Sequence, residues 1–320
     1  MRPRPLRAVA RRTGLLAAAL AGAVPGAMAQ GVPVAAVFSA TEAEQQPRFV
    51  FPAKDRQLQR DLDRVLGQQP FRRLVRNNQL SVALVDLSTP GQVRYAGVQD
   101  DRMRYAASLP KIGILLGVFA EVDHGTIEYT PALRGKLERM IRRSENAVST
   151  ELIELVGFRA IEAALRDPRY QLYSPSRNGG LWVGRDYGGG IGVWRRDPLH
   201  KISHGATARQ VARFFVMLER GELVSPDASA EMKSILGDPE LHHKFVLGLD
   251  QRPNSKIYRK SGTWRQFHAD AALVERDGRK YVAVALLESR SATGVFADLI
   301  VRLDDVIHTA RPPSQRSATE

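Results

Sequence analysis

The chain of 320 residues contains no cysteine. This absence excludes a thiol nucleophile, a thiolate zinc site, a disulfide and a lipid-modified amino-terminal cysteine. A chain of this length can bury a sizeable core and needs no cross-links, even outside the cell. The metal signal is also poor, because His200 and His204 lie in a stretch that contains proline and glycine. We therefore expect neither a metal ion nor another cofactor.

The sequence also offers little that could cross a bilayer. The apolar run Leu15–Val24 is too short for a comfortable span. It follows five arginines and no acidic residue, and Ala27–Ala29 follows it as a small-x-small cleavage signal. We expect residues 1–29 to be an export peptide cleaved before Gln30, which leaves a periplasmic or secreted protein without a stable membrane span. The pair Arg11-Arg12 would suit export by the twin-arginine route, so the choice between this route and the general one stays open.

Positive charge is abundant but not concentrated. The formal net charge of +13 falls to +8 without the export peptide, which holds five arginines and no acid. The rest is spread over pairs such as Arg72-Arg73, Arg142-Arg143 and Arg195-Arg196. This pattern favours a solvated basic surface over a nucleic-acid site. The positive surface is also compatible with attraction to an anionic cell-wall polymer. We expect the protein to be a monomer whose substrate is a small molecule or a peptide.

Hydrophobic periodicity predicts the organisation of the chain. A tether over residues 30–54 precedes one catalytic domain over residues 55–311, and a polar tail covers 312–320. Strand patterns appear at 80–86, 93–98, 256–262, 267–274 and 281–287, and helical patterns fill most of 108–224. Neighbouring strands with local connections indicate an antiparallel sheet. We expect an α/β (α+β) part from about 55–107 and 225–311, with an all-α part from about 108–224 inserted between them.

The first motif is Ser108-Leu-Pro-Lys111, the only Ser-x-x-Lys in the chain. Its apolar continuation predicts that both residues lie at the head of a buried helix, on one face. A serine hydroxyl needs a neighbouring base to be a good nucleophile, and lysine serves only when burial or another cation lowers its pKa. The ordinary alternative is a capping serine followed by a surface lysine.

The second motif, Ser144-Glu145-Asn146, lies at an expected break between two helices. Ser144 could relay a proton to a leaving nitrogen, and Asn146 could hold a substrate amide carbonyl. Taken alone, the motif is equally typical of a helix N-cap.

The third motif is Lys260-Ser261-Gly262-Thr263, at the end of a predicted strand. Glycine at that position allows close approach of a ligand backbone. Lys260 suits a substrate carboxylate, and the amide of Thr263 could pair with that of Ser108 as an oxyanion hole. Each motif is weak alone, but the three in this order indicate an acyl-transfer site.

With these motifs the chain resembles the serine β-lactamase and penicillin-binding protein superfamily, and most closely class A β-lactamases. The resemblance covers about residues 55–310 and includes His204–Phe214 and Gly221–Asp227. It implies an antiparallel sheet flanked by helices, beside an all-α part, with the active site between them. The roles it implies are nucleophile for Ser108, base partner for Lys111, proton shuttle for Ser144, substrate contact for Asn146, and a carboxylate- and carbonyl-binding strand for Lys260, Ser261, Gly262 and Thr263.

One departure from class A concerns the glutamate that positions the water for deacylation. No glutamate occurs between Glu162 and Glu219. Asp167 or Asp186 could substitute, and we expect the glycine-rich stretch 179–192 to rim the cleft. A milder departure is Glu145, where aspartate is usual.

Three functions remain open at this point. The first is a class A-like serine hydrolase that opens β-lactams through an acyl-enzyme on Ser108. The second is a D,D-peptidase or amidase that acts on cell-wall peptides, for which lysine and water suffice. The third is a binding protein that keeps the cleft without turnover. Three complete motifs argue against the third.

Overall fold

The computed structural model describes residues 49, 51–290, 292 and 294–309. The predicted export peptide, most of the tether and the polar tail lie outside these residues. Within them, no helix is both long enough and apolar enough to cross a membrane.

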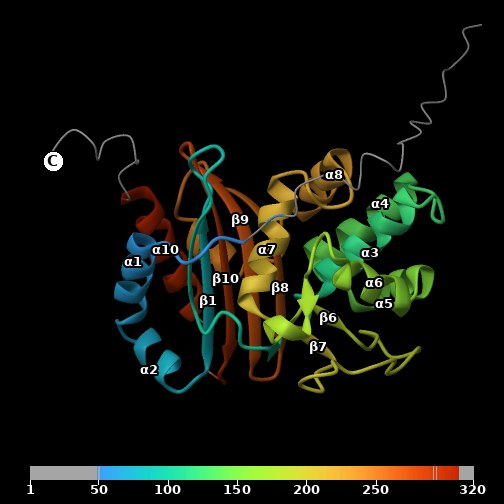
Figure 1. The fold of residues 1–320 in the computed structure, drawn as a ribbon, viewed down its shortest axis with the longest axis horizontal. Coiled ribbons are helices and arrows are strands. Elements are labelled where there is room, and N and C mark those ends of the chain that lie inside the picture. Colours follow the sequence, from blue (N-terminus) through green and yellow to red (C-terminus); the bar gives the residue numbers. More distant parts are fainter. Residues whose placement is uncertain (1–48, 50, 291, 293, 310–320) are drawn as a thin grey trace, which may run out of the picture. The chain divides into compact units, whose positions relative to one another are not determined.

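A five-stranded sheet forms the centre of the structure (Figure 1). Its spatial order is β2-β1-β10-β9-β8, and all neighbouring strands are antiparallel. The strands are β1 (Leu80–Asp86), β2 (Arg94–Val98), β8 (Lys256–Trp264), β9 (Phe267–Arg276) and β10 (Arg279–Glu288). This arrangement confirms the predicted antiparallel sheet, with its two parts separated in the sequence by the mainly helical segment.

Helices cover both faces of the sheet. On one face lie α1 and α10, which share a core with apolar residues of β1, β9 and β10. On the other face α7 contacts β1, β9 and β10 and joins the sheet to the helices of the inserted segment. The helices are α1 (Arg56–Leu66), α2 (Phe71–Arg76), α3 (Lys111–Asp123), α4 (Pro131–Glu138), α5 (Asn146–Val156), α6 (Phe158–Arg166), α7 (Ala208–Glu219), α8 (Pro226–Leu236), α9 (Phe245–Leu249) and α10 (Val295–Thr309), with a π-helix η1 (Arg139–Arg143) and a short 3₁₀ helix η2 (Pro175–Arg177).

Local sequence explains where several helices begin. The Asp55 carboxylate accepts a hydrogen bond from the amide of Leu58 at 2.8 Å and caps α1. The Thr207 hydroxyl caps α7, and the Ser225 hydroxyl caps α8, which starts with a proline. Each cap satisfies an amide that the helix itself leaves unpaired.

The ordered core starts earlier than the predicted domain boundary. Phe49 and Phe51 are buried, and the Phe51 ring packs edge-on against Tyr95 at 4.5 Å. The Lys54 ammonium group donates hydrogen bonds to the Gly97 carbonyl and the Asp100 carboxylate. The predicted tether over 30–54 is therefore wrong at its carboxyl-terminal end, where aromatic burial and an ion pair fix the chain.

Small sheets position the segment between α6 and α7. One contains β3 (Arg104–Tyr105), β7 (His204–Ala206) and β6 (Trp182–Val183), and another pairs β4 (Tyr173–Ser174) with β5 (Gly179–Gly180). Because β3 lies just before Ser108, its pairing with β7 brings the loop between β6 and β7 to the serine.

Candidate active site

Ser108 lies in a turn between β3 and α3. The residue before it, Ala107, has a φ of 50°, in the left-handed region that non-glycine residues seldom adopt. The amide of Lys111 donates to the Ser108 carbonyl at 3.3 Å, but the helix begins only at Lys111. The prediction that both residues lie on the helix is therefore wrong for Ser108, because the turn is completed before the helix starts. The Ser108 hydroxyl has no hydrogen-bond partner among the described residues, and Ser108 lines a cavity of about 620 Å³.

Lys111 joins the first motif to the second. Its side chain is fully buried, and its ammonium group donates to the carbonyls of Ser144 at 2.8 Å and Glu145 at 3.3 Å, and to Asn146 Oδ1 at 2.9 Å. No carboxylate among the described residues forms an ion pair with it. Burial lowers the pKa of Lys111 to about 7, although the Glu145 charge acts in the opposite direction. A large fraction of its amine is therefore neutral near neutral pH.

Lys260 joins the third motif to the second. Its ammonium group donates to the Ser144 hydroxyl at 2.8 Å and to the Ser261 carbonyl at 2.8 Å. Ser144 has a φ of 60°, which ends η1 and turns its side chain toward β8. Burial lowers the pKa of Lys260 well below its ordinary value, and the charges of Lys111 and Arg259 lower it further. Two buried lysines therefore lie close together in this site.

Gly262 brings the third motif against the serine. A Cβ atom at this position would lie 2.2 Å from the Ala106 carbonyl oxygen and 2.7 Å from the Ser108 amide nitrogen. Only glycine fits, because both obstacles are backbone atoms. The close approach places the Ser108 amide beside the residue that precedes Thr263, and Thr263 lines the same cavity. The motif lies within β8, which continues to Trp264 beyond the predicted end.

Lys244 is a site residue that the sequence patterns did not reveal. Its ammonium group donates to the Gly262 carbonyl at 2.6 Å, to Thr263 Oγ1 at 2.8 Å and to the Ala269 carbonyl at 3.0 Å. Burial lowers its pKa to about 8. Beside it, the His243 ring lies 3.2 Å from the Ser261 hydroxyl. Both residues precede α9, so only the tertiary fold brings them to β8.

Tyr187 and Asp186 come from the loop between β6 and β7, as predicted for a segment that rims the cleft. The Tyr187 ring lies 4.5 Å from Lys111 Nζ, and its hydroxyl donates to the Ala107 carbonyl at 3.3 Å. Burial raises the pKa of Tyr187, so the phenol stays neutral. Asp186 is buried, and its Oδ2 accepts hydrogen bonds from the amides of Ile191 and Gly192, each at 2.9 Å.

The two predicted substitutes for the loop glutamate thus differ in position. Asp186 is the only carboxylate among the described residues that line the cavity. Asp167 instead accepts hydrogen bonds from the backbone and side chain of Arg169 and is not part of the lining. Of the two, Asp186 alone stays a candidate for a role in deacylation.

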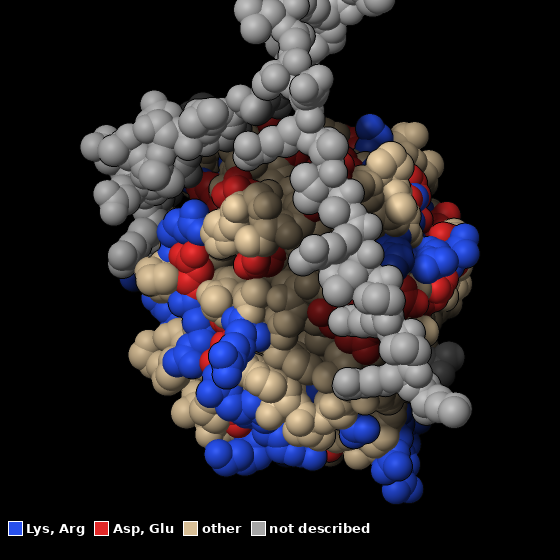
Figure 2. Space-filling model, turned by 90° about the vertical axis from the view of Figure 1, so that its right-hand side faces the viewer, with Lys and Arg blue, Asp and Glu red and all other residues tan. Residues whose placement is uncertain are grey.

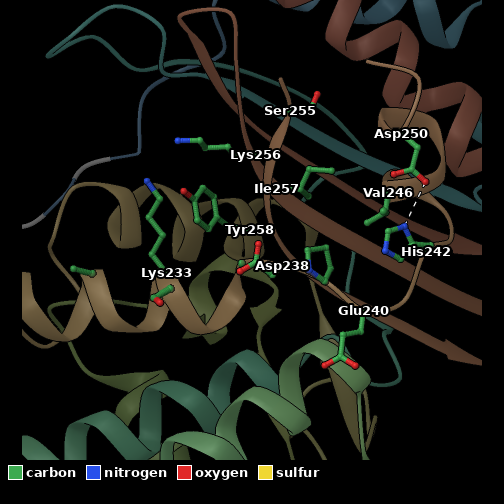
Figure 3. A pocket seen from close by; sticks show the side chains of 14 residues that line it. Lys233, Asp238, Glu240, His242, Val246, Asp250, Ser255, Lys256, Ile257 and Tyr258 are labelled. Atoms are coloured by element: carbon green, nitrogen blue, oxygen red, sulfur yellow. Dashed lines mark ion pairs between the residues drawn. The ribbon is translucent and has the colours of Figure 1, made fainter. Parts of the chain in front are cut away.

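A larger cavity, of about 890 Å³, lies elsewhere, between α8, the start of β8 and α9 (Figure 3). Its lining mixes charges of both signs, including Lys233, Asp238 and Glu240, and His242 lies 3.5 Å from Asp250 across one side. None of the three motifs contributes a lining residue. Size alone therefore does not identify the site, because each motif contributes a lining residue, Ser108, Asn146 or Thr263, to the smaller cavity.

A family model described as the β-lactamase enzyme family matches residues 129–308, more than half of the chain. The chain belongs to this family. The match confirms the resemblance found from the motifs, although it starts after Ser108 and Lys111. No curated protein matches the chain significantly.

Solved structures of related proteins share the fold. PBP-A is 18% identical with a TM-score of 0.59, and the match covers 81% of this chain and 98% of PBP-A. A β-lactamase from Chitinophaga pinensis is 14% identical with a TM-score of 0.60, covering 77% and 97% of the two chains. A β-lactamase from Sphaerobacter thermophilus is 15% identical with a TM-score of 0.58, covering 80% and 98%. At these identities the similarity establishes the fold alone.

Proposed function

We propose that the protein is a class A-like serine hydrolase that opens the amide bond of β-lactams through an acyl-enzyme on Ser108. One observation carries this proposal. Lys111 and Lys260 are buried, no carboxylate of the described residues forms an ion pair with either, and both contact Ser144; Ser108, three residues before Lys111, lines the cavity. Burying an unpaired ammonium group is costly, and a purely structural role would be filled better by an apolar side chain. A lysine with a pKa of about 7 is suited to proton transfer near neutral pH.

In the acylation step, the neutral amine of Lys111 accepts the proton of Ser108 as Oγ attacks the lactam carbonyl carbon. The amides of Ser108 and Thr263 donate hydrogen bonds to the oxygen that becomes negative. The carbon–nitrogen bond then breaks, and the leaving nitrogen takes a proton from the hydroxyl of Ser144, which regains a proton from the Lys260 ammonium group that donates to it. Lys111 must give up part of its present hydrogen bonding, because no hydrogen bond joins it to Ser108 Oγ in this structure.

The substrate carboxylate is held where cations and hydroxyls gather at the end of β8. Lys260, Ser261 and Thr263 supply these groups, and Gly262 lets β8 pack directly against the backbone of Ala106 and Ser108. Lys244 adds a second cation at Thr263. Asn146 also lines the cavity, and its amide NH2 group suits a substrate carbonyl, because its Oδ1 accepts from Lys111.

A D,D-peptidase acting on cell-wall peptides is the second candidate. It is favoured by the loop between β6 and β7. There a neutral Tyr187 covers Lys111. Two backbone amides bind Asp186, the only carboxylate among the described residues that line the cavity. Asp186 Oδ1 accepts no hydrogen bond from the described residues, but it is buried and so has little access to a water molecule, which suits a long-lived acyl-enzyme. One structure similar to this chain is described as an acyl-enzyme complex of a PBP-A mutant with penicillin G.

Intact-mass spectrometry of the purified protein with benzylpenicillin tests the proposal. We expect the mass of one penicillin to be added, peptide mapping to place it on Ser108, and Ser108→Ala to abolish it. No added mass, or an adduct that persists in Ser108→Ala, would contradict the proposal. Rapid loss of a chromogenic cephalosporin would favour the β-lactamase, whereas an adduct that survives for hours would favour the peptidase. Asp186→Asn shows whether this carboxylate sets the adduct lifetime.

A further inference from the structure

The cavity beside Ser108 has an aromatic wall. The Tyr105 ring centroid lies 5.8 Å from that of Trp264 and 5.2 Å from that of Phe267. Trp264 is 46% exposed, although a large aromatic side chain is normally covered in a monomer. All three rings line the cavity. They offer an apolar aromatic surface to whatever group a substrate places there.

The same cavity has a cationic wall formed by Arg185, Arg196 and Lys201. All three side chains come from the loop between β6 and β7 and are exposed. Among the described residues, no carboxylate forms an ion pair with Arg196 or Lys201. Arg185 lies 3.6 Å from Asp186 Oδ1, but that carboxylate has no exposed surface. The wall therefore presents a net positive charge to the cavity.

Figure 2 agrees with this distribution of charge. Lys and Arg side chains gather over the lower part of the face shown, at the level where Figure 1 places the loops beside β6 and β7. Acidic side chains are more frequent in the upper part of that face.

The backbone that carries these cations is held in place by its own hydrogen bonds. The Asp197 amide donates to the Ile202 carbonyl at 2.8 Å, and the Lys201 amide donates to the Asp197 carbonyl at 3.0 Å. The Arg196 guanidinium group donates to the Lys201 carbonyl at 3.1 Å. The Asp197 carboxylate is buried and accepts hydrogen bonds from the Tyr173 hydroxyl and the His200 amide. It is thus engaged in holding the turn, and a turn held in this way reduces the entropy lost on binding.

We propose that Arg185, Arg196 and Lys201 bind a carboxylate on the acyl side chain of the substrate, while the Tyr105–Trp264–Phe267 wall holds an apolar part of that side chain. The inference rests on the proposed function, because it assigns the second charged group of the same substrate. The carboxylate beside the reacting amide is held at Lys260, Lys244 and Thr263, so the preferred substrate carries two separate negative charges. A β-lactam with an acidic side chain and a cell-wall peptide with an acidic residue share this chemistry.

Benzylpenicillin and carbenicillin form a matched pair of probes, because carbenicillin adds one carboxylate to the acyl side chain. Their equilibrium binding is measured by calorimetry to Ser108→Ala, which cannot be acylated. We expect the ratio of affinities, carbenicillin over benzylpenicillin, to fall about fivefold when Arg196→Gln and Lys201→Gln are added together. The ratio falls similarly in about 0.5 M salt, which screens exposed charges. As a control, Arg72→Gln with Arg73→Gln removes the same charge from exposed positions on α2 and leaves the ratio unchanged.

The outcomes separate this inference from the proposed function. An unchanged ratio in the Arg196/Lys201 variant, an equal change in the control, or no binding of either penicillin overturns the anion site. Absence of an adduct on the wild-type Ser108 contradicts the proposed function, whatever the binding result. A second pair, N-succinyl- and N-butyryl-D-alanyl-D-alanine, identifies the source of the carboxylate. A succinyl preference that is larger than the carbenicillin preference and is lost in the Arg196/Lys201 variant assigns the site to peptides.

Discussion

The surroundings of the lysine side chains, and the resulting shifts in pKa, are opposite in two regions of the molecule. In the first region Lys111 and Lys260 are buried, no carboxylate of the described residues forms an ion pair with either, and burial lowers the pKa of both. In the second, Lys233 on α8 and Lys280 on β10 share the carboxylates of Glu219 and Glu275. Burial alone would lower the pKa of Lys233, but its hydrogen bonds to these carboxylates raise it instead.

Under the proposed function, this difference separates the lysines that serve chemistry from those that serve the fold. A paired lysine stays charged and connects elements, whereas an unpaired buried lysine loses its proton easily and can accept one from a hydroxyl. The ion pairs of the second region connect α7, α8, β9 and β10 through partly exposed side chains. The comparison is therefore testable by applying the same substitution in both regions.

The largest effect is expected from Lys111→Arg, with Lys233→Arg as the matched control. A guanidinium group stays protonated and cannot accept the Ser108 proton. We expect acylation by benzylpenicillin to slow by about 10²- to 10⁴-fold, the usual contribution of a general base. Lys233→Arg should acylate at the wild-type rate. Similar losses in both variants would erase the distinction between the two regions, and thermal unfolding checks that each variant is folded.

Gly262→Ala should follow in size. The added methyl group meets the Ala106 carbonyl oxygen at 2.2 Å and displaces the Ser108 amide. We expect stability to fall by about 1–3 kcal/mol and acylation to fall by about 10²-fold, because an oxyanion donor moves. The control is Gly135→Ala in α4, where a Cβ meets nothing within 4 Å and alanine should stabilise by about 0.5–1 kcal/mol. Urea unfolding measures the change in stability, and the rate of adduct formation measures acylation. Acylation of Gly262→Ala at the wild-type rate would argue against the proposed oxyanion hole.

The smallest effect is expected from Glu219→Gln in the paired region. Glu219 accepts from Lys233 at 2.7 Å and also contacts Lys280, and all three side chains are partly exposed. We expect a loss of about 1 kcal/mol in unfolding free energy, reduced by added salt, with no change in acylation. A change in the acylation rate larger than twofold would show that this region is coupled to the active site.

The sequence predicted the parts of the site that local pattern controls. Strands β8 and β9 were predicted at 256–262 and 267–274, close to their observed bounds, and the three motifs carry residue types that point to one chemistry.

What the sequence did not reveal depends on long-range packing. Lys244 reaches β8 only because Arg259, paired with Asp270 at 2.7 Å, also donates to the carbonyls of Leu241 and His243 and holds that loop. Tyr187 covers Lys111 only because β6 pairs with β7 and turns the loop back toward α3. Ser108 lies outside the helix because the turn at Ala107 has an unusual backbone conformation that no local pattern indicates.

The pH dependence of acylation tests most directly whether a neutral lysine activates Ser108. The pKa of Lys111 is lowered to about 7, so its amine is mostly protonated below that pH and mostly free above it. The rate of adduct formation with benzylpenicillin should rise about tenfold per pH unit below the pKa and level off above it. Lys111→Arg should remove this rise while the fold is retained. A rate that is flat between about pH 5 and 9, or an unchanged rise in Lys111→Arg, would contradict the account.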